Sequence, residues 1–444
     1  MIRLIMPFLL AFAILLILIQ KPVSAQEVLT LEEAIEIGLE KNYGIQISQN
    51  IREQASNNHS LGNAGFLPSL DLNGFRVETI EDSDLEFADG TTQENRGARN
   101  TVTGAAIELD WTIFDGLTMF ASYDRLGSLR EVRDEELRLN MENLVRTIAI
   151  QYFEVIRLSE QVRNLESNLE VSEERIEIEE AKVEIGSGSE YDLLQARSDM
   201  NEDRSVLFRI LNSLSESKIA LNELLARDPE IDYEVNREIN LNRYLSEDEL
   251  YQKLIAENAE LSIARLEQDI TRHEMREIRG ERYPQISLNS SYSYNRSEND
   301  GGFFRFNEAR GLTVGLTARI NLFDGFNTSR RVQNAQINQK NAELTFEAQK
   351  LRLESEFLTI YRTYRNRLEL VDLEEENFIN AEETLDIALE RFRLGSISSL
   401  EFREAQRTLL AAEDRLINSR FEAKVAETEL LNLSGNLEQL MINH

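Results

Sequence analysis

The sequence predicts a mainly α-helical, internally duplicated protein that also carries four β-strands of the kind found in membranes. Three observations predict this class. A set of short motifs occurs twice in the same order, and long stretches without proline carry apolar residues three and four positions apart. Between them, apolar and polar residues alternate. The first spacing is typical of α-helices packed as antiparallel coiled coils, and the second is typical of strands with one apolar face.

The first 25 residues have the features of a secretory signal peptide. Arg3 supplies a positive charge, an apolar stretch follows, and Val23-Ser24-Ala25 forms a cleavage site before Gln26. An uncleaved membrane anchor is the alternative. Because the chain contains no cysteine, a lipid cannot be attached to a mature N-terminal cysteine and disulfides are excluded.

The chain is strongly acidic, with a formal net charge of −32. This excess speaks against nucleic-acid binding, because phosphates need Lys or Arg partners. It fits a solvated surface or an acidic cavity that favours cations. After residue 25 no apolar run is long enough for a membrane helix. A mature protein that spans a bilayer would therefore have to use β-strands closed into a barrel.

The duplication is visible as two sets of motifs at nearly constant offsets. Leu67–Asn73 returns as Tyr283–Asn289 at an offset of 216 residues, and the later motifs return at an offset of 209. Offsets that stay constant over more than a hundred residues indicate that the architecture is duplicated. We place the first repeat at 26–235 and the second at 236–437, with a short tail at 438–444. Each repeat is expected to contain a helix, a strand hairpin and a long helical hairpin.

The long helices are predicted from the apolar periodicity and from the absence of proline. One such helix runs from about 118 to 184 and would be ~100 Å long at 1.5 Å per residue. It ends near Gly186, and its counterpart in the second repeat ends near Gly395. Glycine terminates a helix, and the serines that follow suit the start of a returning helix. Each repeat therefore carries a helical hairpin with a Gly-Ser tip.

The strand hairpins are expected at about 69–113 and about 285–322, where the apolar period changes to two. Each has about the length needed to cross a bilayer. Four strands cannot close into a barrel alone, since the smallest membrane barrels have about eight. Either several chains pool their strands or the hairpins lie on a soluble core. Pooling is the more economical interpretation, and a trimer would supply twelve strands.

With these motifs in order, the chain resembles the TolC-like outer-membrane efflux proteins of Gram-negative bacteria. The matching set is Leu-Thr-Leu near residue 30, a proline before a strand, Phe-Asp-Gly before the long helix, and Gly-Ser at the tip, followed by an alanine ten residues after the glycine. The resemblance covers essentially the whole mature chain. One departure is that the family often has Asn-Pro near the first helix, whereas this chain has Asn42-Tyr43 and Asn258-Ala259.

The resemblance implies a homotrimer with a twelve-stranded barrel in the outer-membrane lipid and an α-helical tunnel through the periplasm. It further implies a passive exit duct of a tripartite efflux or type I secretion system. A periplasmic adaptor protein would dock on the hairpin tips, and an inner-membrane transporter would supply the energy. The family resemblance implies no enzyme activity and no cofactor. The transported substrate does not follow from it.

The resemblance also implies three groups of functional residues. The tips that meet the adaptor are Gly186, Ser187, Gly395 and Ser396. The residues that line the periplasmic aperture are Tyr191, Asp192, Glu401 and Glu404, with the two glutamates forming carboxylate rings in a trimer. The junctions between barrel and helices are marked by Pro68, Phe114, Asp115 and Gly116, and by Pro284, Phe323, Asp324 and Gly325. Helix caps and a solvated helix face are the alternative explanations of the first two groups.

A second departure concerns the latch that closes the tip in some relatives. That latch uses a tyrosine three residues before the second glycine and an arginine two residues after it. The corresponding residues are Phe392 and Ile397, which can form neither the phenol hydrogen bond nor the salt bridge. We therefore expect a constriction that is held differently or is leakier.

The sequence gives little indication of metal binding or catalysis. The three histidines have no second ligand at helical spacing, so no zinc set is expected. No catalytic constellation is apparent. A periplasmic coiled-coil adaptor or scaffold protein is the alternative function, because it too would have a signal peptide and helical hairpins. Adaptors, however, carry a single helical hairpin and not a duplicated pattern of strand and helical hairpins.

Overall fold

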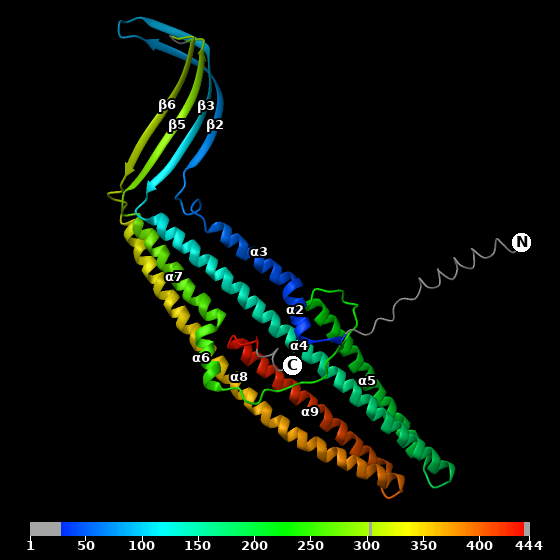
Figure 1. Ribbon diagram of the computed structural model, residues 1–444. Helices are drawn as coiled ribbons and strands as arrows, with labels where there is room; N and C mark the ends of the chain where they lie inside the picture. The colour runs from blue at the N-terminus through cyan, green and yellow to red at the C-terminus, as the bar shows by residue number, and fades with distance from the viewer. Residues whose placement is uncertain (1–27, 302–303, 439–444) are drawn as a thin grey trace, which may run out of the picture. The chain divides into compact units, whose positions relative to one another are not determined.

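A computed structural model describes residues 28–301 and 304–438 (Figure 1). The predicted signal peptide lies outside the described residues, as does the predicted tail after residue 438. The first repeat forms, in order, β1 (Val28–Leu29), α2 (Leu31–Lys41), α3 (Tyr43–Asn58), β2 (Ser69–Glu86), β3 (Thr92–Phe114), α4 (Thr118–Glu184) and α5 (Glu190–Leu224). The second forms β4 (Glu234–Val235), α6 (Glu247–Glu257), α7 (Ala259–Gly280), β5 (Gln285–Asn299), β6 (Phe306–Arg319), α8 (Asn327–Arg393) and α9 (Ser399–Leu433).

The two repeats match each other element by element. Helices α4 and α8 each contain 67 residues, and α5 and α9 each contain 35. The match extends to single hydrogen bonds. Asn42 Nδ2 donates to the carbonyl of Leu224 at 2.9 Å, and Asn258 Nδ2 donates to the carbonyl of Leu433 at 3.0 Å. The predicted fold class, mainly helical and duplicated with a few long strands, is confirmed.

The chain divides into two compact units, and each draws on both repeats. The strand-bearing unit consists of Gln49–Glu136 and Glu260–Gln349. The helical unit consists of the described residues up to Ser48, of Leu137–Ala259, and of the described residues from Lys350 onward. Each unit contains elements of the first repeat and their counterparts from the second. Neither repeat therefore forms a compact unit by itself.

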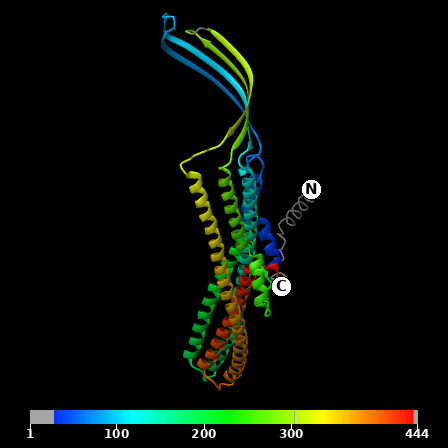
Figure 2. The same cartoon turned by 90° about the vertical axis from the view of Figure 1, so that its left-hand side faces the viewer.

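In the strand-bearing unit, the four long strands form one antiparallel sheet in the order β2-β3-β5-β6 (Figure 2). Strands β3 and β5 pair across the repeat boundary, with Leu109 opposite Ser290. Strands β2 and β6 are the two edges of this sheet. Their outer backbone N–H and C=O groups have no neighbouring strand within the described chain.

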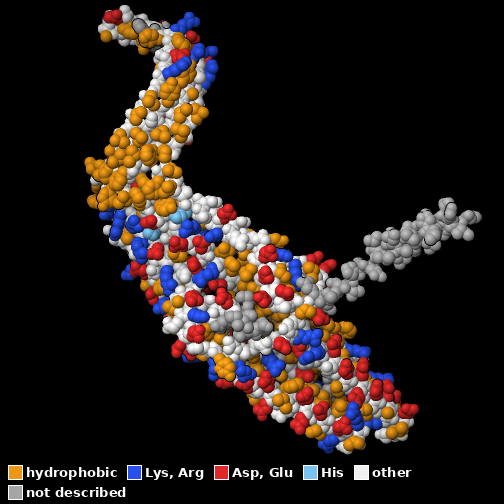
Figure 3. All heavy atoms as spheres, in the orientation of Figure 1, with side chains coloured by type: hydrophobic (Ala, Val, Ile, Leu, Met, Phe, Trp, Pro, Cys, Tyr) orange, Lys and Arg blue, Asp and Glu red, His pale blue; other side chains and the backbone are white. Residues whose placement is uncertain are grey.

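One face of the sheet is apolar and exposed. Ile107 lies opposite Tyr292, and Tyr292 lies opposite Leu312, so these three side chains form one row across the sheet. All three are exposed, and Figure 3 shows apolar side chains gathered over the strands. A contiguous exposed apolar surface is typical of a site that contacts a membrane or another protein chain.

The helical unit has a conventional buried core. The long helix α4 contributes fully buried side chains at three- and four-residue intervals, including Ile148, Tyr152, Val155 and Ile156. These positions form the apolar seam on which the other helices of the unit pack. Among residues 28–301 and 304–438, every helix is too short or too polar to cross a bilayer.

Candidate functional site: hairpin tips and strand–helix junctions

Both helical hairpins turn through the same hydrogen-bonded motif. At the first tip, Gly186 N–H donates to the Val183 carbonyl at 3.0 Å, and Ser187 N–H donates to the Lys182 carbonyl at 2.9 Å. This pair of bonds is the Schellman motif, which satisfies the last carbonyls of a helix. Gly186 has φ = 75°, a conformation that favours glycine.

The second tip repeats these bonds. Gly395 N–H donates to the Phe392 carbonyl at 3.0 Å, Ser396 N–H donates to the Arg391 carbonyl at 2.8 Å, and Gly395 has φ = 68°. A Cβ atom added at Gly186 or at Gly395 would meet no other atom within 4 Å. Within one chain, the backbone conformation alone therefore requires glycine at both tips.

The predicted aperture residues lie in the first turns of the returning helices. Ser189 caps α5, where Tyr191 N–H donates to its hydroxyl at 3.2 Å, and Asp192 occupies the third helical position. Ser398 caps α9, and Glu401 occupies the equivalent third position. Tyr191 is exposed. Asp192 and Glu401 thus hold corresponding places in the two repeats.

Glu401 completes a capping box at the start of α9. The Ser398 N–H donates to Glu401 Oε2 at 2.8 Å, and Glu401 N–H donates to Ser398 Oγ at 3.2 Å. The backbone hydrogen bond from Ser398 lowers the pKa of the Glu401 carboxyl below its ordinary value. Its carboxylate is therefore ionised and oriented. Glu404 lies one turn further along and is exposed.

The two latch positions are part of an apolar cluster. Phe392 and Phe402 are fully buried, and their rings stack with centroids 4.8 Å apart. Ile397 packs against this cluster. Lys182 Nζ, from the first repeat, lies 3.7 Å from the centroid of the Phe392 ring. Phe392 and Ile397 cannot form the latch of some relatives. They belong instead to an apolar cluster that the first hairpin also contacts, through Lys182 on the Phe392 ring.

The sequence does not predict a buried polar network that links α4, α5 and α9. Its centre is the ion pair between Arg403 of α9 and Asp203 of α5, with two hydrogen bonds of 2.8 Å each. Asn168 Nδ2 of α4 donates to the same carboxylate at 3.0 Å. Gln406 Nε2 donates to the Ser172 hydroxyl at 2.7 Å. All five side chains are buried.

A second ion pair extends the network toward the tip. Arg175 of α4 donates to Asp199 Oδ2 at 2.7 Å, and its Nε and Nη2 donate to the Ser399 hydroxyl at 3.1 and 3.0 Å. Arg175 is 2% exposed. The network therefore joins α4 and α5 of the first repeat to α9 of the second. Each of these buried polar side chains has a hydrogen-bond partner, without which its burial would cost free energy.

The Phe-Asp-Gly motifs mark the two turns where a strand leads into a long helix. Met119 N–H donates to Asp115 Oδ2 at 2.9 Å, and Thr328 N–H donates to Asp324 Oδ2 at 2.7 Å. Both aspartates therefore cap their helices in the same way. Burial raises the pKa of Asp115, whereas hydrogen bonds from Thr328 lower the pKa of Asp324.

Pro68 and Pro284 stand directly before β2 and β5, the first strand of each hairpin. Phe114 is the last residue of β3, whereas β6 ends at Arg319, before Phe323. Phe323 and the following Phe326 are both exposed, and their rings meet edge to face with centroids 5.4 Å apart.

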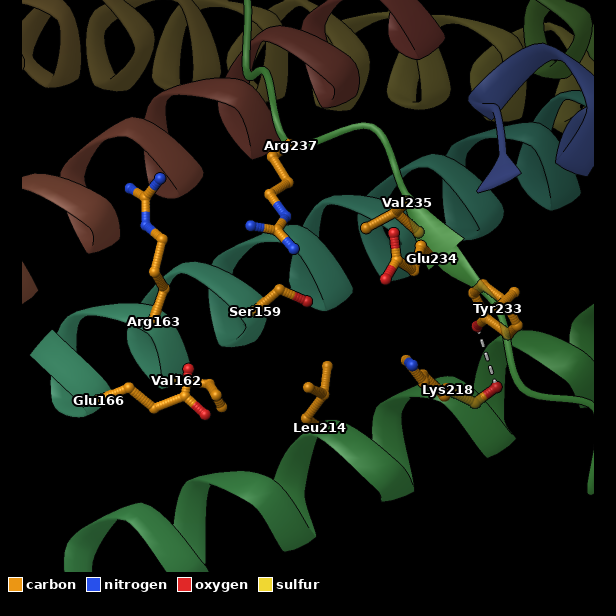
Figure 4. Close-up of a pocket in the computed structure, with 10 residues that line it drawn as sticks. All are labelled: Ser159, Val162, Arg163, Glu166, Leu214, Lys218, Tyr233, Glu234, Val235 and Arg237. Atoms are coloured by element: carbon orange, nitrogen blue, oxygen red, sulfur yellow. Dashed lines mark hydrogen bonds between the residues drawn. The ribbon is translucent and has the colours of Figure 1, made fainter. Parts of the chain in front are cut away.

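A small cavity in the helical unit lies apart from every predicted site residue. It has a volume of about 210 Å³ and lies between α4, α5 and the segment around β4 (Figure 4). Arg163, Lys218 and Arg237 share its lining with Glu166 and Glu234, so its charge is mixed. Tyr233 hydroxyl closes one side by donating to the Lys218 carbonyl at 3.1 Å.

Comparisons with known proteins agree with this architecture. The chain is 22% identical over 334 residues to the outer membrane protein TolC of Vibrio cholerae serotype O1, covering 72% of this chain and 74% of the relative. It is 21% identical over 330 residues to the proteases secretion protein PrtF of Dickeya chrysanthemi, covering 70% and 68%.

The crystal structure of the outer membrane protein VceC from Vibrio cholerae has the same fold, with a TM-score of 0.75 at 18% identity over 91% of this chain and 96% of that one. The model of the outer membrane efflux protein family matches this chain twice, over residues 35–227 and 250–436, in agreement with the duplication. The chain therefore belongs to the outer membrane efflux protein family.

Proposed function

We propose that three copies of this chain form an exit duct that carries substrate across the periplasm and the outer membrane. One observation carries the proposal. A four-stranded sheet with an exposed apolar face and two open edges is joined to two helices of 67 residues. A helix of that length spans about 100 Å. Three such sheets joined edge to edge make twelve strands, a size that closes into a membrane barrel.

The dimensions of the sheet fit a bilayer. Trp111 of β3 is exposed three residues before the end of that strand at Phe114, and its indole N–H donates to the Phe66 carbonyl at 2.9 Å. Tyr294 of β5 lies opposite Ala105, which comes six residues before Trp111 in β3. Six residues of a strand rise roughly 20 Å, which is close to the height of the apolar band in outer-membrane barrels. The two aromatic levels would lie at the two membrane interfaces.

The duct would be part of a tripartite efflux or secretion system. The tips at Gly186-Ser187 and Gly395-Ser396 would receive the periplasmic adaptor, and an inner-membrane transporter would drive transport. Ile185 and Leu394 precede the tip glycines and are exposed. Apolar side chains at the end of a charged hairpin are suited to contact another helical tip. An adaptor role for this chain itself is set aside, because the chain belongs to the outer-membrane family.

The periplasmic aperture would be lined by the first turns of α9. Three copies of Glu401 and of Glu404 would form two rings of carboxylates, which favour cations. The capping box supports this role, because it keeps the Glu401 carboxylate ionised and in one orientation. Tyr191 and Asp192 at the equivalent turn of α5 would complete the lining.

The proposal is tested by assembly and by conductance. The mature protein should be recovered from the outer-membrane fraction and should run in detergent with the mass of three subunits. In planar bilayers it should form cation-selective channels, and Glu401→Ala/Glu404→Ala should reduce the selectivity. A monodisperse single subunit, or channels whose conductance and selectivity are unchanged in the double variant, would contradict the trimer or the rings respectively.

A further inference from the structure

The apolar face of the four-stranded sheet ends at a definite level along the strands. Its last apolar row contains Leu72, Ile107, Tyr292 and Leu312, which lie opposite one another in register. In an antiparallel sheet, directly opposite residues point to the same face, and so do residues two positions apart in one strand. Counting in twos from this row therefore identifies the side chains that follow on the same face, farther from the helices.

Arginines occupy the next two rows of this face. Tyr294 lies opposite Arg310 in the first of these rows. In the second, Arg76 lies opposite Thr103, and Thr103 lies opposite Arg296. Arg76, Arg296 and Arg310 are all exposed, and together they are named the arginine belt. Figure 3 shows Lys and Arg side chains gathered beyond the apolar part of the strands.

At this level the charged side chains have changed face. On the opposite face, the row between the two arginine rows consists of Phe75, Gly104, Asn295 and Ala309, which are uncharged. Nearer the helices the arrangement is reversed, because there Asp110 lies on the opposite face. The arginine belt therefore points to what surrounds the sheet on its apolar side. In the proposed duct this surrounding is the outer membrane.

The arginine belt retains free hydrogen-bond donors. Arg296 donates from Nε and Nη2 to Glu298, and Arg310 donates from Nη2 to Glu308 at 2.8 Å. A guanidinium group carries five N–H bonds, so both side chains keep unused donors. Arg76 has no ion pair within residues 28–301 and 304–438. The belt can therefore bind an anion without first breaking these contacts.

Aromatic rings contact two members of the belt. Arg310 Cζ lies 5.3 Å from the centroid of the Tyr294 ring, and Arg296 Cζ lies 5.2 Å from the centroid of the Phe306 ring. The attraction between a cation and an aromatic face stabilises such contacts. Tyrosine is enriched at membrane interfaces, where its ring meets the headgroups. Both guanidinium groups are thus positioned near the level at which the apolar band ends.

The level of the belt matches the lipid headgroups in the proposed duct. Arg310 shares its row with Tyr294, which marks the edge of the apolar band that is farther from the helices. Arg76 and Arg296 lie one row further, which is roughly 7 Å for two residues of a strand. The headgroup region on each side of a bilayer is about 5–7 Å thick. Because the helices extend into the periplasm, the belt faces the leaflet at the cell surface.

We propose that the arginine belt binds the phosphate groups of a lipid in the outer leaflet of the outer membrane. This rests on the proposed function, because only a sheet inserted in that membrane brings the belt to this leaflet. A guanidinium group donates two parallel N–H bonds to one phosphate, which suits arginine better than lysine for this contact. The acyl chains of the lipid would lie on the apolar rows that contain Leu72, Ile107 and Tyr292.

The surface between Arg76 and Arg296 has room for a phosphate. Strand β3 separates β2 from β5, and neighbouring strands are about 4.8 Å apart, so the two backbones are about 10 Å apart at this row. Thr103 lies between them, and its short side chain adds a hydroxyl donor. A Cβ atom added at Gly74, one row nearer the apolar band, would meet only the Gly104 carbonyl oxygen at 3.9 Å. One phosphate above Thr103 would therefore be within reach of both guanidinium groups.

Lipid binding to the detergent-solubilised trimer tests the inference. The probe is diphosphoryl lipid A, a glycolipid with phosphate groups, and bound lipids are counted by native mass spectrometry over a titration. Arg76→Gln should weaken the binding about fivefold, the effect of one arginine near an anionic lipid surface. Arg76→Lys, which keeps the charge and loses the paired N–H bonds, should weaken it less. Because Arg76 has no ion pair within the described chain, neither change leaves a carboxylate unpaired.

The matched control is Arg96→Gln, which removes the same charge from the same strand hairpin, farther from the apolar band. Arg96 pairs with Asp84 at 2.9 Å, and its variant should bind the lipid as the parent protein does. The triple variant Arg76→Gln/Arg296→Gln/Arg310→Gln should weaken the binding about a hundredfold. Equal affinities of Arg76→Gln and Arg96→Gln for the lipid would contradict the inference.

Two further arms separate the lipid from its phosphate. The same glycolipid without phosphates should bind more weakly to the parent protein, and equal affinity for the two forms overturns the inference. Inorganic phosphate should not displace the lipid at a comparable concentration, and displacement would identify a site for a free anion instead. A trimeric channel that fails these tests leaves the duct intact. A single subunit in detergent overturns the proposed function itself.

Discussion

Arg403 and Asp203 form a buried, two-pronged ion pair between residues 200 positions apart in the sequence. Their side chains are 10% and 6% exposed. The pair joins α9 of the second repeat to α5 of the first, so it links the returning helices of the two hairpins. Arg403 directly follows Phe402, which stacks on Phe392 at one of the two positions where some relatives have latch residues. We therefore expect this pair and its neighbours to hold the two hairpins together.

Removing one partner of this pair should destabilise the tips strongly. Asp203→Ala removes the carboxylate that accepts two hydrogen bonds from the buried Arg403 guanidinium and leaves only Asp199, whose Oδ2 lies 3.8 Å from Arg403 Nε. Removing one partner of a buried pair typically costs about 3–5 kcal/mol. Thermal unfolding should show the loss, and the single-channel conductance should rise as the hairpins separate. Glu180→Gln, which breaks the exposed pair with Arg197, is the matched control and should cost about 0–1 kcal/mol. Similar effects of the two variants would contradict a holding role for Arg403.

The double variant Asp203→Ala/Arg403→Leu should be less destabilised than Asp203→Ala alone. It introduces the residues found at the equivalent positions of the other repeat, Ala412 and Leu194, and it removes both buried charges together. Replacing both members of a buried pair by apolar groups is often nearly neutral. A double-mutant cycle measured by thermal unfolding gives the coupling energy. Additive losses would show that the two side chains do not act as a pair.

The fold could be predicted from the sequence because its signals are local and occur twice. The apolar periodicity predicts a helix from about 118 to 184, and α4 runs from Thr118 to Glu184. The glycines of the tips and the aspartates of the junctions are also local signals. The Arg403–Asp203 pair could not be predicted, because its members lie in opposite repeats and their counterparts carry no charge. Only the packing of one hairpin on the other brings them together.

Restoring the tyrosine of the latch should weaken this tip and not tighten it. Phe392 is fully buried against Phe402, so the hydroxyl added by Phe392→Tyr would be buried without a designed partner. An unsatisfied buried hydroxyl costs about 1–3 kcal/mol. The unfolding temperature should fall and the conductance should not decrease. Leu394→Tyr, at an exposed tip position, is the control. A lower conductance in Phe392→Tyr would indicate that the latch can still form.

The capping box should make the second tip sensitive to acid. The pKa of Glu401 is lowered in the folded protein, so its contribution to stability is present above the ordinary carboxyl pKa of about 4.3 and is lost as the pH falls through the lower folded value. Glu401→Gln should therefore increase amide exchange in the first turn of α9 at pH 7, and the difference from the parent protein should disappear in acid. Glu404→Gln is the control at the next turn. A difference that persists unchanged in acid would exclude the carboxylate as its cause.

Glu413 should have the opposite pH dependence. Burial and the nearby Glu382 raise its pKa to about 7, although Arg163 acts in the other direction. Because the folded value lies above that of the unfolded chain, stability should fall as the pH rises from about 4.3 through about 7. Glu413→Gln removes this ionisation, so it should raise the unfolding temperature at pH 8 and leave it nearly unchanged at pH 4. Glu382→Gln should give part of the same gain by removing the repulsion. If Glu413→Gln shifts the unfolding temperature equally at both pH values, then the lost charge is not the cause and a change in packing is.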